Sequence, residues 1–457
     1  MMKNVNNRKK TYLLFLLMGV SMFSAAQDSL WRNLVKGNIE GEWRSFYMAT
    51  DNTEELKNFQ ALTTGGRVGY GTRFYKGWSL YTSLYLSQSL GIEDLTVQDI
   101  ETRKGSRYEI GLLDVEDPSK RTVLLWGEAY LKYADDSQQL RIGRMRLNTP
   151  FLNLQDGRMI PTLVEGAWYK FGKEKWSVQG GAIWRIAPRS SSRFYGIGES
   201  IGVYPTGRSV TGDAAGYRDH THSNLILIGN MNYTPNKSVK WELWDYWVHN
   251  IMHMPYTTLI WNKSSFNWKW TLGAQYALQH QIGEGGNEQL SNRYFDNNSV
   301  IHMVGTRLGA AYRGWKLTLN GNIIRGDGRF LFPREWGKEA FFTFQKRERS
   351  EGTANSEALM LQLSRQWEFT QWKLTMIAGY GYYWRNHPSE AINNKYAMPT
   401  YEHLNFDIFV NLGKRWKLEY LMAYKRSQDE LAQQSGFIIN KVDMVNHNLQ
   451  LRYRIGG

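Results

Sequence analysis

The sequence predicts an all-β transmembrane protein, an antiparallel β-barrel of the outer-membrane type, and three patterns along its 457 residues support this fold class. Apolar and polar residues alternate over many segments of strand length. A tryptophan repeatedly follows a short basic or polar turn. Short and long connections between the segments alternate. Barrels of this type show all three, because each strand turns apolar side chains to lipid and polar side chains to the lumen.

The alternation is clearest in the final segment, residues 448–455. Its apolar and polar residues would point to opposite faces of a strand: Leu449, Leu451, Tyr453 and Ile455 on one side, Asn448, Gln450, Arg452 and Arg454 on the other. No run of eighteen apolar residues follows the N-terminal region, so a hydropathy window finds no spanning helix. A period of two therefore predicts spanning strands instead.

The same pattern predicts about 18 strands, with 16 as the alternative count. They lie near residues 37–48, 65–75, 78–89, 123–134, 138–144, 163–171, 175–186, 224–233, 238–248, 256–262, 267–279, 301–313, 315–325, 356–368, 371–384, 404–413, 416–426 and 445–455. Such lengths suit a tilted crossing of a bilayer. The segment at 256–262 has the weakest pattern.

Seven tryptophans stand where a predicted strand begins, as in KGWSLYTSL and RGWKLTLNG. They are Trp78, Trp176, Trp241, Trp268, Trp315, Trp372 and Trp416. An indole ring prefers the membrane interface, while the adjacent lysine or arginine stays in water. These residues therefore predict an aromatic belt, and the short turns beside them place the belt at the periplasmic rim.

The longer connections are expected to be extracellular loops, because outer-membrane barrels have short periplasmic turns and long outside loops. They lie at residues 49–64, 90–122, 145–162, 187–223, 249–255, 280–300, 326–355, 385–403 and 427–444.

The N-terminus has the pattern of a secretory signal. A basic head is followed by the apolar stretch TYLLFLLMGVSMF and by small residues, which predicts cleavage between Ala26 and Gln27. We therefore expect residues 1–26 to be a signal peptide, residues 27–457 to form a single barrel domain, and the protein to lie in the outer membrane. With no cysteine, the chain offers neither a lipoprotein anchor nor a disulfide framework.

Charge narrows the expected partners. Removal of Lys3, Arg8, Lys9 and Lys10 with the signal lowers the formal charge from +14 to +10. In a secreted chain this balance favours anionic or zwitterionic solutes and the phosphates of outer-membrane lipids over nucleic acid. Turn lysines that simply face water or lipopolysaccharide are the alternative explanation.

The third long connection, RMRLNTPFLNLQDGRMIPTLVEG, is the most distinctive segment. It carries Arg144, Arg146, Asp156 and Arg158 beside two prolines that stiffen the backbone. A stiff, charged loop near residues 144–163 that folds inward would narrow the lumen, and arginines there would favour anions. The alternative is an outside loop in which Asp156 pairs with Arg158.

Other charged residues are expected to face the lumen by the alternation. Arg307, Arg452 and Arg454 join the candidate constriction residues on this basis. The remaining inward charges are Arg141, Arg185, Glu40, Glu42, Glu128 and Asp407.

Catalytic and metal sites have little support. His220 and His222 lie beside Ser223, and His249 and His253 lie four apart, but the segments are strand and loop without a carboxylate at ligand spacing. Three neighbours in sequence also do not make a catalytic triad in space. We expect no cofactor and no bound metal.

Several segments resemble the OprD-type outer-membrane porins. The matching pieces are GEWRSFYMATDN at 41–52, LRIGRMRLNTPFLNLQDGRMIPTLVEGAWY at 140–169, GDGRFLFPREWGKEAFFTF at 326–344 and the last two hairpins. The resemblance implies a monomeric 18-stranded barrel with a narrow, arginine-lined eyelet. It carries an eyelet role to Arg146, Asp156 and Arg158, and it implies passage of amino acids, short peptides and organic or aromatic acids.

The sequence therefore supports a passive, substrate-selective porin that is not an enzyme. Two alternatives remain at this stage. One is a barrel lipase or protease built around His220, His222 and Ser223, and the other is a structural or adhesive barrel with a closed lumen.

Overall fold

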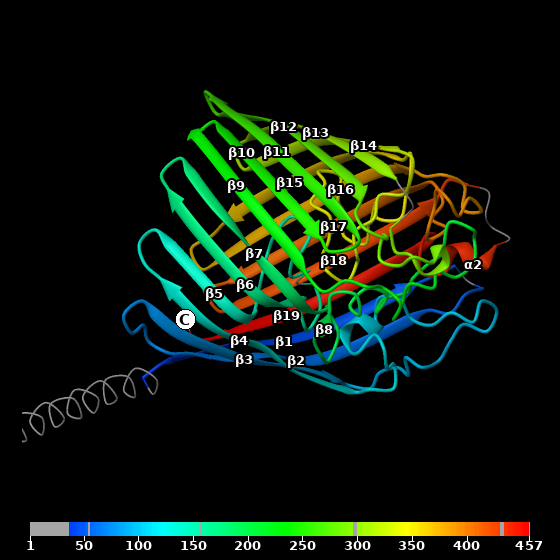
Figure 1. Cartoon of the computed structure of the whole chain (residues 1–457), viewed down its shortest axis with the longest axis horizontal. Helices are drawn as coiled ribbons and strands as arrows, with labels where there is room; N and C mark the ends of the chain where they lie inside the picture. Colours follow the sequence, from blue (N-terminus) through cyan, green and yellow to red (C-terminus); the bar gives the residue numbers. More distant parts are fainter. Residues whose placement is uncertain (1–35, 54, 156, 296–298, 430–433, 457) are drawn as a thin grey trace, which may run out of the picture.

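The computed structural model describes residues 36–53, 55–155, 157–295, 299–429 and 434–456. Eighteen antiparallel spanning strands and one two-residue strand form a closed barrel (Figure 1). The first and last strands close the ring, with Ser45 opposite Leu451. In the described part of the chain, no helix is long and apolar enough to cross a membrane.

The bounds of the elements follow the chain. The strands are β1 (Asn38–Asp51), β2 (Phe59–Gly71), β3 (Trp78–Ser89), β4 (Thr122–Ala134), β5 (Gln138–Met145), β6 (Leu163–Lys173), β7 (Trp176–Ala187), β8 (Tyr195–Gly196), β9 (Ile226–Asn236), β10 (Val239–Val248), β11 (Met252–Ser265), β12 (Trp268–Gln281), β13 (Val300–Tyr312), β14 (Trp315–Gly326), β15 (Glu357–Glu368), β16 (Trp372–Trp384), β17 (Tyr401–Leu412), β18 (Trp416–Ser427) and β19 (Met444–Ile455). Three short helical turns lie in the connections: η1 (Ile110–Leu112), η2 (Leu290–Asn292) and α2 (Ser435–Ile438).

The predicted fold class and the count of 18 spanning strands are confirmed. Several boundaries differ, most clearly at β2 and β11. β2 begins six residues earlier than predicted, at Phe59 rather than 65. The connection predicted as a long loop at 249–255 is only a tight turn at 249–251, because β11 already begins at Met252.

The weak pattern of β11 has a physical cause. Its inward-facing residues Met252, Met254 and Tyr256 are apolar and at most 2% exposed, because inward-folded loops pack on them. Its outward positions include His253 and Pro255. The usual rule of apolar outside and polar inside is therefore reversed in this stretch, and the alternation alone misjudged it.

The tryptophan belt lies where the sequence placed it along the strands. Six of the seven residues are the first residue of their strand, and Trp241 is the third residue of β10. All seven are at least 36% exposed. Several pack against an aromatic ring at the adjoining strand end. Trp176 stacks on Tyr233 with centroids 4.0 Å apart, and Trp78 lies at a tilt against Tyr133 at 5.1 Å. The short turns and the C-terminus share this end of the barrel (Figure 1).

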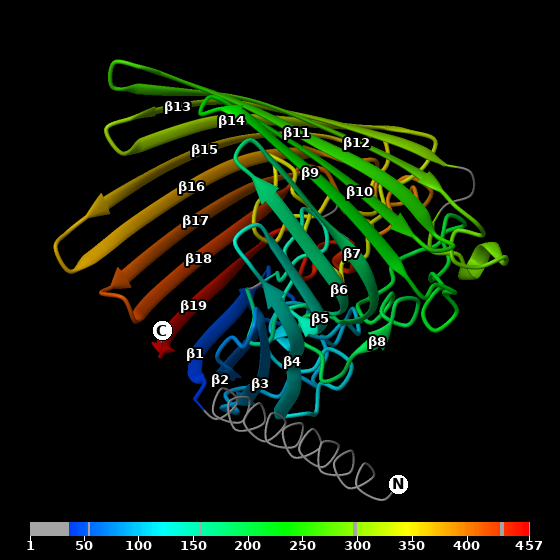
Figure 2. The same ribbon diagram turned by 60° about the vertical axis from the view of Figure 1, so that its left-hand side comes forward.

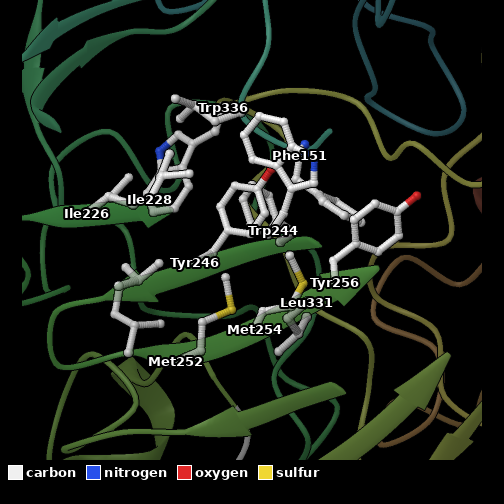
Figure 3. Close-up of a cluster of buried hydrophobic side chains, with 14 of the residues drawn as sticks. Phe151, Ile226, Ile228, Trp244, Tyr246, Met252, Met254, Tyr256, Leu331 and Trp336 are labelled. Atoms are coloured by element: carbon white, nitrogen blue, oxygen red, sulfur yellow. Dashed lines mark hydrogen bonds between the residues drawn. The ribbon is translucent and has the colours of Figure 1, made fainter. Parts of the chain in front are cut away.

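The largest cluster of buried apolar side chains lies inside the barrel. Its centre is Phe151, a loop residue with no exposed surface (Figure 3). Five aromatic rings surround it with centroids between 5.0 and 6.2 Å away: Tyr246, Tyr256, Phe330, Phe332 and Phe341. Aromatic packing of this kind holds the loops against the barrel wall, as it holds elements together in the core of a soluble domain.

Phe151→Ala should remove the centre of this cluster and lower the free energy of unfolding by about 3–5 kcal/mol, the usual cost of an aromatic cavity. Urea titration of the protein in lipid vesicles measures the change. Phe266→Ala is the control, since this side chain is fully exposed. Equal unfolding free energies for both variants would contradict the structural role of Phe151.

Candidate pore constriction

Two loops fold into the barrel and meet there. Loop 3 (residues 146–162) leaves the wall after Met145 and returns at Leu163, and loop 7 (residues 327–356) joins β14 to β15. The backbone N–H of Asn153 donates to the Trp336 carbonyl at 3.0 Å, and the Gln155 amide donates to the Arg334 carbonyl at 2.7 Å. These hydrogen bonds make one unit of the two loops.

The backbones of the two loops approach each other closely at Gly337. A Cβ added there would lie 1.8 Å from the Phe151 carbonyl oxygen, a distance that no side chain tolerates. The Asn153 amide also donates to the Lys338 carbonyl at 2.9 Å. Glycine at this position therefore permits the contact between the loops.

Loop 7 crosses the lumen from one side of the wall to the other. On β12, the Gln275 amide donates to the Ala340 carbonyl at 2.8 Å. On the far side, Lys346 pairs with Asp407 of β17 at 2.6 Å, and Arg347 donates to Asn446 of β19 at 2.8 Å. The yellow segment in Figure 2 follows this course within the ring of strands. The sequence predicted a long extracellular connection here, and the structure has one between β14 and β15. Its inward course was not predicted, because wall residues far away in sequence hold the loop inside the barrel.

Arg158 of loop 3 lies in a group of three arginines, which we call the constriction cluster: Arg158, Arg189 and Arg347. Arg158 is 3% exposed, and its Nε has no hydrogen-bond partner among the described residues. The Nε of Arg189 is likewise buried and unpartnered there. Within the described residues, no carboxylate lies within ion-pair distance of any of the three.

The surroundings lower the pKa values of two of these arginines, Arg158 and Arg347. Burial lowers the pKa of Arg158 well below its usual value, and the charges of Arg347 and Arg189 lower it further. Burial also lowers the pKa of Arg347 to about 10, with Arg189 acting in the same direction. Three guanidinium groups thus concentrate positive charge at one place inside the barrel. The cluster therefore favours an anion beside it.

Glu109 is the carboxylate that acts on both Arg158 and Arg347. It has no exposed surface and accepts hydrogen bonds from Thr50 at 2.5 Å and Ser106 at 2.7 Å. Burial raises the pKa of Glu109 above its usual value, although these hydrogen bonds oppose the shift. The carboxylate of Glu109 therefore offsets only part of the positive charge of the three arginines.

A chain of alternating charges runs down the neighbouring wall. Arg44 donates to the Arg158 carbonyl at 2.5 Å and pairs with Glu42 at 2.5 Å. Arg452 lies between Glu42 at 3.8 Å and Glu419 at 3.2 Å. Arg452 thus faces the lumen as predicted, within a paired chain.

The other predicted constriction residues are spread along the lumen. Arg146 interacts electrostatically with Glu40 and Tyr85, which both face inward. Arg307 also faces inward and holds loop 7, since its guanidinium donates to the Phe342 carbonyl at 3.2 Å and stacks on that ring. Arg454 is exposed near the periplasmic end of β19. Asp156 lies outside the described residues.

Arg144, in contrast, does not face the lumen. It is the penultimate residue of β5 and points the same way as Ile142, which is 42% exposed on the outer face of the barrel. There it pairs with Glu165 of β6 at 3.0 Å. Arg144 still belongs to the strand, where the alternation turns it to the lipid side, so the prediction of a constriction role for Arg144 was wrong. Arg185 also pairs with Glu165 on this face, at 3.7 Å, rather than facing inward.

Sequence reasoning missed Arg189 and Arg347. Arg189 follows the end of β7, and Arg347 lies in the charged run QKRERS of loop 7. Both come to Arg158 only through the folding of loops that are far apart in sequence. The similarity of the adjoining segment 326–344 to a porin loop was the one available signal.

In the described part of the chain, the candidate catalytic and metal-binding residues are not brought together into a site. His220 bonds to the Gly216 carbonyl at 2.8 Å rather than to a serine, and the buried hydroxyl of Ser223 has no partner there. No group of three His, Asp or Glu side chains among the described residues is placed to hold a metal ion.

Comparisons with known proteins agree with the fold. A profile of the outer membrane porin, OprD family, matches residues 106–343. OccK9 (OpdG) of Pseudomonas aeruginosa is 16% identical with a TM-score of 0.69, and the match covers 93% of this chain and 100% of that chain. OpdK of the same species, solved with vanillate, is 13% identical with a TM-score of 0.67, and the match covers 93% of this chain and 100% of that chain. OccAB4 of Acinetobacter baumannii is 13% identical with a TM-score of 0.67, and the match covers 92% of this chain and 98% of that chain. No curated protein matches the sequence.

Gly337→Ala should separate loops 3 and 7, because the new Cβ cannot lie against the Phe151 carbonyl. We expect faster amide hydrogen exchange in segments 149–155 and 334–341, measured by mass spectrometry. Gly229→Ala is the matched control, since no atom lies within 4 Å of a Cβ added there. If exchange in these segments is the same in both variants, the close approach is not needed to hold the loops.

Proposed function

The chain belongs to the OprD family of outer-membrane porins, and on this basis we propose that it admits small carboxylate-bearing solutes by passive diffusion past the constriction cluster. The family and the barrel fold point to a channel rather than an enzyme. Amino acids, short peptides and organic acids are the expected solutes.

One observation carries the proposal: Arg158 and Arg347 both lie against the turn that holds Glu109. The Nε of Arg158 would lie 2.8 Å from a Cβ added at Gly111, and Arg347 lies over the Tyr108 ring at 5.2 Å. Glu109 is the carboxylate that acts on both arginines. Guanidinium groups bind carboxylates through paired N–H donors. An excess of positive charge where loops 3 and 7 narrow the lumen raises the local concentration of anions. Conduction also requires easy release, so we expect weak binding and saturation only at high solute concentration.

The alternating chain on the wall supports the same solute class. Glu42 and Glu419 follow the arginines toward the periplasmic end. A solute with one carboxylate and a neutral or cationic remainder would meet complementary charges in sequence. OpdK was solved with vanillate, an aromatic carboxylate, and this also supports the class.

We further propose that the protein is a monomer exported by a signal peptide cut between Ala26 and Gln27. These two residues lie outside the described residues. The composition of the segment, with its basic head and apolar centre, supports the assignment.

Arg158→Gln combined with Arg347→Gln should lower the ratio of anion to cation permeability by about fivefold for each charge removed, because a unit charge at 4 Å in water contributes about 1 kcal/mol. Reversal potentials across planar bilayers in a salt gradient measure the ratio, and uptake of carboxylates into liposomes should fall in parallel. Arg325→Gln is the control, because Arg325 is exposed and pairs with Glu357 on the outer face. An unchanged reversal potential in the double variant would contradict the role of the constriction cluster in anion preference.

Glu109→Gln should have the opposite effect and raise anion preference, since it removes the negative charge beside Arg158. The native protein should show the same rise as pH falls, because the Glu109 carboxylate becomes neutral below its raised pKa. Reversal potentials between pH 7 and about pH 4 would show a pH-dependent step in the native protein that is absent from the variant. A step of equal size in both would assign the titration to another group.

A further inference from the structure

Four arginines gather at the extracellular ends of β5 to β8, on the outside of the barrel. We call them the outer arginine patch: Arg144, Arg185, Arg193 and Arg218. Two carboxylates, Glu165 and Glu116, are each shared by two of these arginines. Asp219 lies 3.7 Å from Arg218 as a third carboxylate. The patch therefore carries one more positive than negative charge.

The first half of the patch surrounds Glu165. Arg144 lies 3.0 Å and Arg185 3.7 Å from its carboxylate, and the side chain of Arg185 is 42% exposed. The guanidinium of Arg144 also stacks on the rings of Phe194 and Trp126, with its carbon 4.7 and 5.6 Å from their centroids. Stacking fixes the direction of this charge without neutralising it.

The second half surrounds Glu116. Arg218 lies 2.9 Å and Arg193 3.7 Å from its carboxylate, with 51% and 68% of their side chains exposed. The Tyr195 hydroxyl donates to the same carboxylate. One acidic group thus serves three donors, and most of the donor groups of Arg193 remain open to the surroundings.

The segment 193–196 joins the two halves into one surface. The Arg185 guanidinium donates to the Phe194 carbonyl at 2.9 Å, and Arg185 stands opposite Gly196 in the β7–β8 pairing. Two large indole rings border the surface on the lipid side, Trp126 with 55% and Trp184 with 36% exposure. Such rings mark the level of lipid headgroups in a bilayer.

Charged side chains elsewhere at this end of the barrel form simple pairs. On the far side, Arg325 at the end of β14 pairs with the single carboxylate of Glu357. On β10 and β11, Asp245 pairs with His253 at 2.6 Å. Arg325 is thus matched by one carboxylate, whereas four arginines of the outer arginine patch share three carboxylates. An additional anion would restore the charge balance in the patch.

We propose that the outer arginine patch binds the phosphate groups of an anionic glycolipid headgroup in the outer leaflet. The guanidinium fork matches phosphate oxygens, and several arginines at headgroup depth beside aromatic rings suit a phosphorylated lipid. The inference depends on the membrane position of the barrel and is independent of which solute passes through the lumen.

The test compares lipids that differ only in phosphate. Purified full-length protein in detergent is titrated with bisphosphorylated lipid A, with dephosphorylated lipid A and with inorganic phosphate, and the thermal unfolding midpoint is followed. Arg185→Gln combined with Arg193→Gln removes two charges, Arg185→Lys combined with Arg193→Lys keeps them, and Arg325→Gln is the matched outward control. Single-channel conductance of each variant verifies that the barrel is folded.

We expect bisphosphorylated lipid A to bind the native protein more tightly than the dephosphorylated form. The glutamine double variant should lose about tenfold in apparent affinity through its missing charge-assisted donors. The lysine variant should recover part of the loss, and R325Q should match the native protein with unchanged conductance. Equal binding of both lipids, or an unchanged glutamine variant, would overturn the proposal. An equal midpoint shift with inorganic phosphate would indicate a site for soluble anions and overturn the lipid assignment.

Discussion

The whole structure depends on one constraint: a backbone inside a membrane must satisfy its own hydrogen bonds. A sheet does so only when it closes, and the antiparallel pairing of β1 with β19 removes the last free edges. Closure then fixes which side chains face lipid and which face the lumen, because successive residues of a strand point to opposite sides. The tryptophans at the strand starts and the polar lumen both follow from it.

Closure also creates an interior that must be filled, and loops 3 and 7 fill part of it. Phe151 and its ring of aromatic neighbours form an apolar core against β10 and β11. Inward residues of these strands are apolar for that reason, as Met252 and Met254 show. The charged residues gather on the other side, along β17 to β19 and β1. Packing of the loops thus decides which sector of the lumen stays polar.

Two arginines of one short segment illustrate the same division. Arg144 and Arg158 lie fourteen positions apart, yet one pairs with Glu165 outside the barrel and the other lies buried among cationic neighbours inside. The end of β5 separates them, because the last residues of the strand still alternate between lipid and lumen while the loop beyond turns inward. The end of β5 therefore divides this segment between the outer arginine patch and the constriction cluster.

The sequence by itself determined the strands, their faces and the belt, because a period of two and the turn chemistry act between near neighbours. It also predicted that loop 3 folds inward and singled out Arg158 as a candidate constriction residue. Tertiary structure alone decided that loop 7 folds inward, that Arg189 and Arg347 join Arg158, and that Arg144 faces lipid. These outcomes depend on contacts between residues far apart in sequence, such as Arg347 with Asn446, 99 positions apart, and Gln155 with Arg334, 179 positions apart. No local pattern encodes such contacts, since they form only when the closed barrel brings distant loops together.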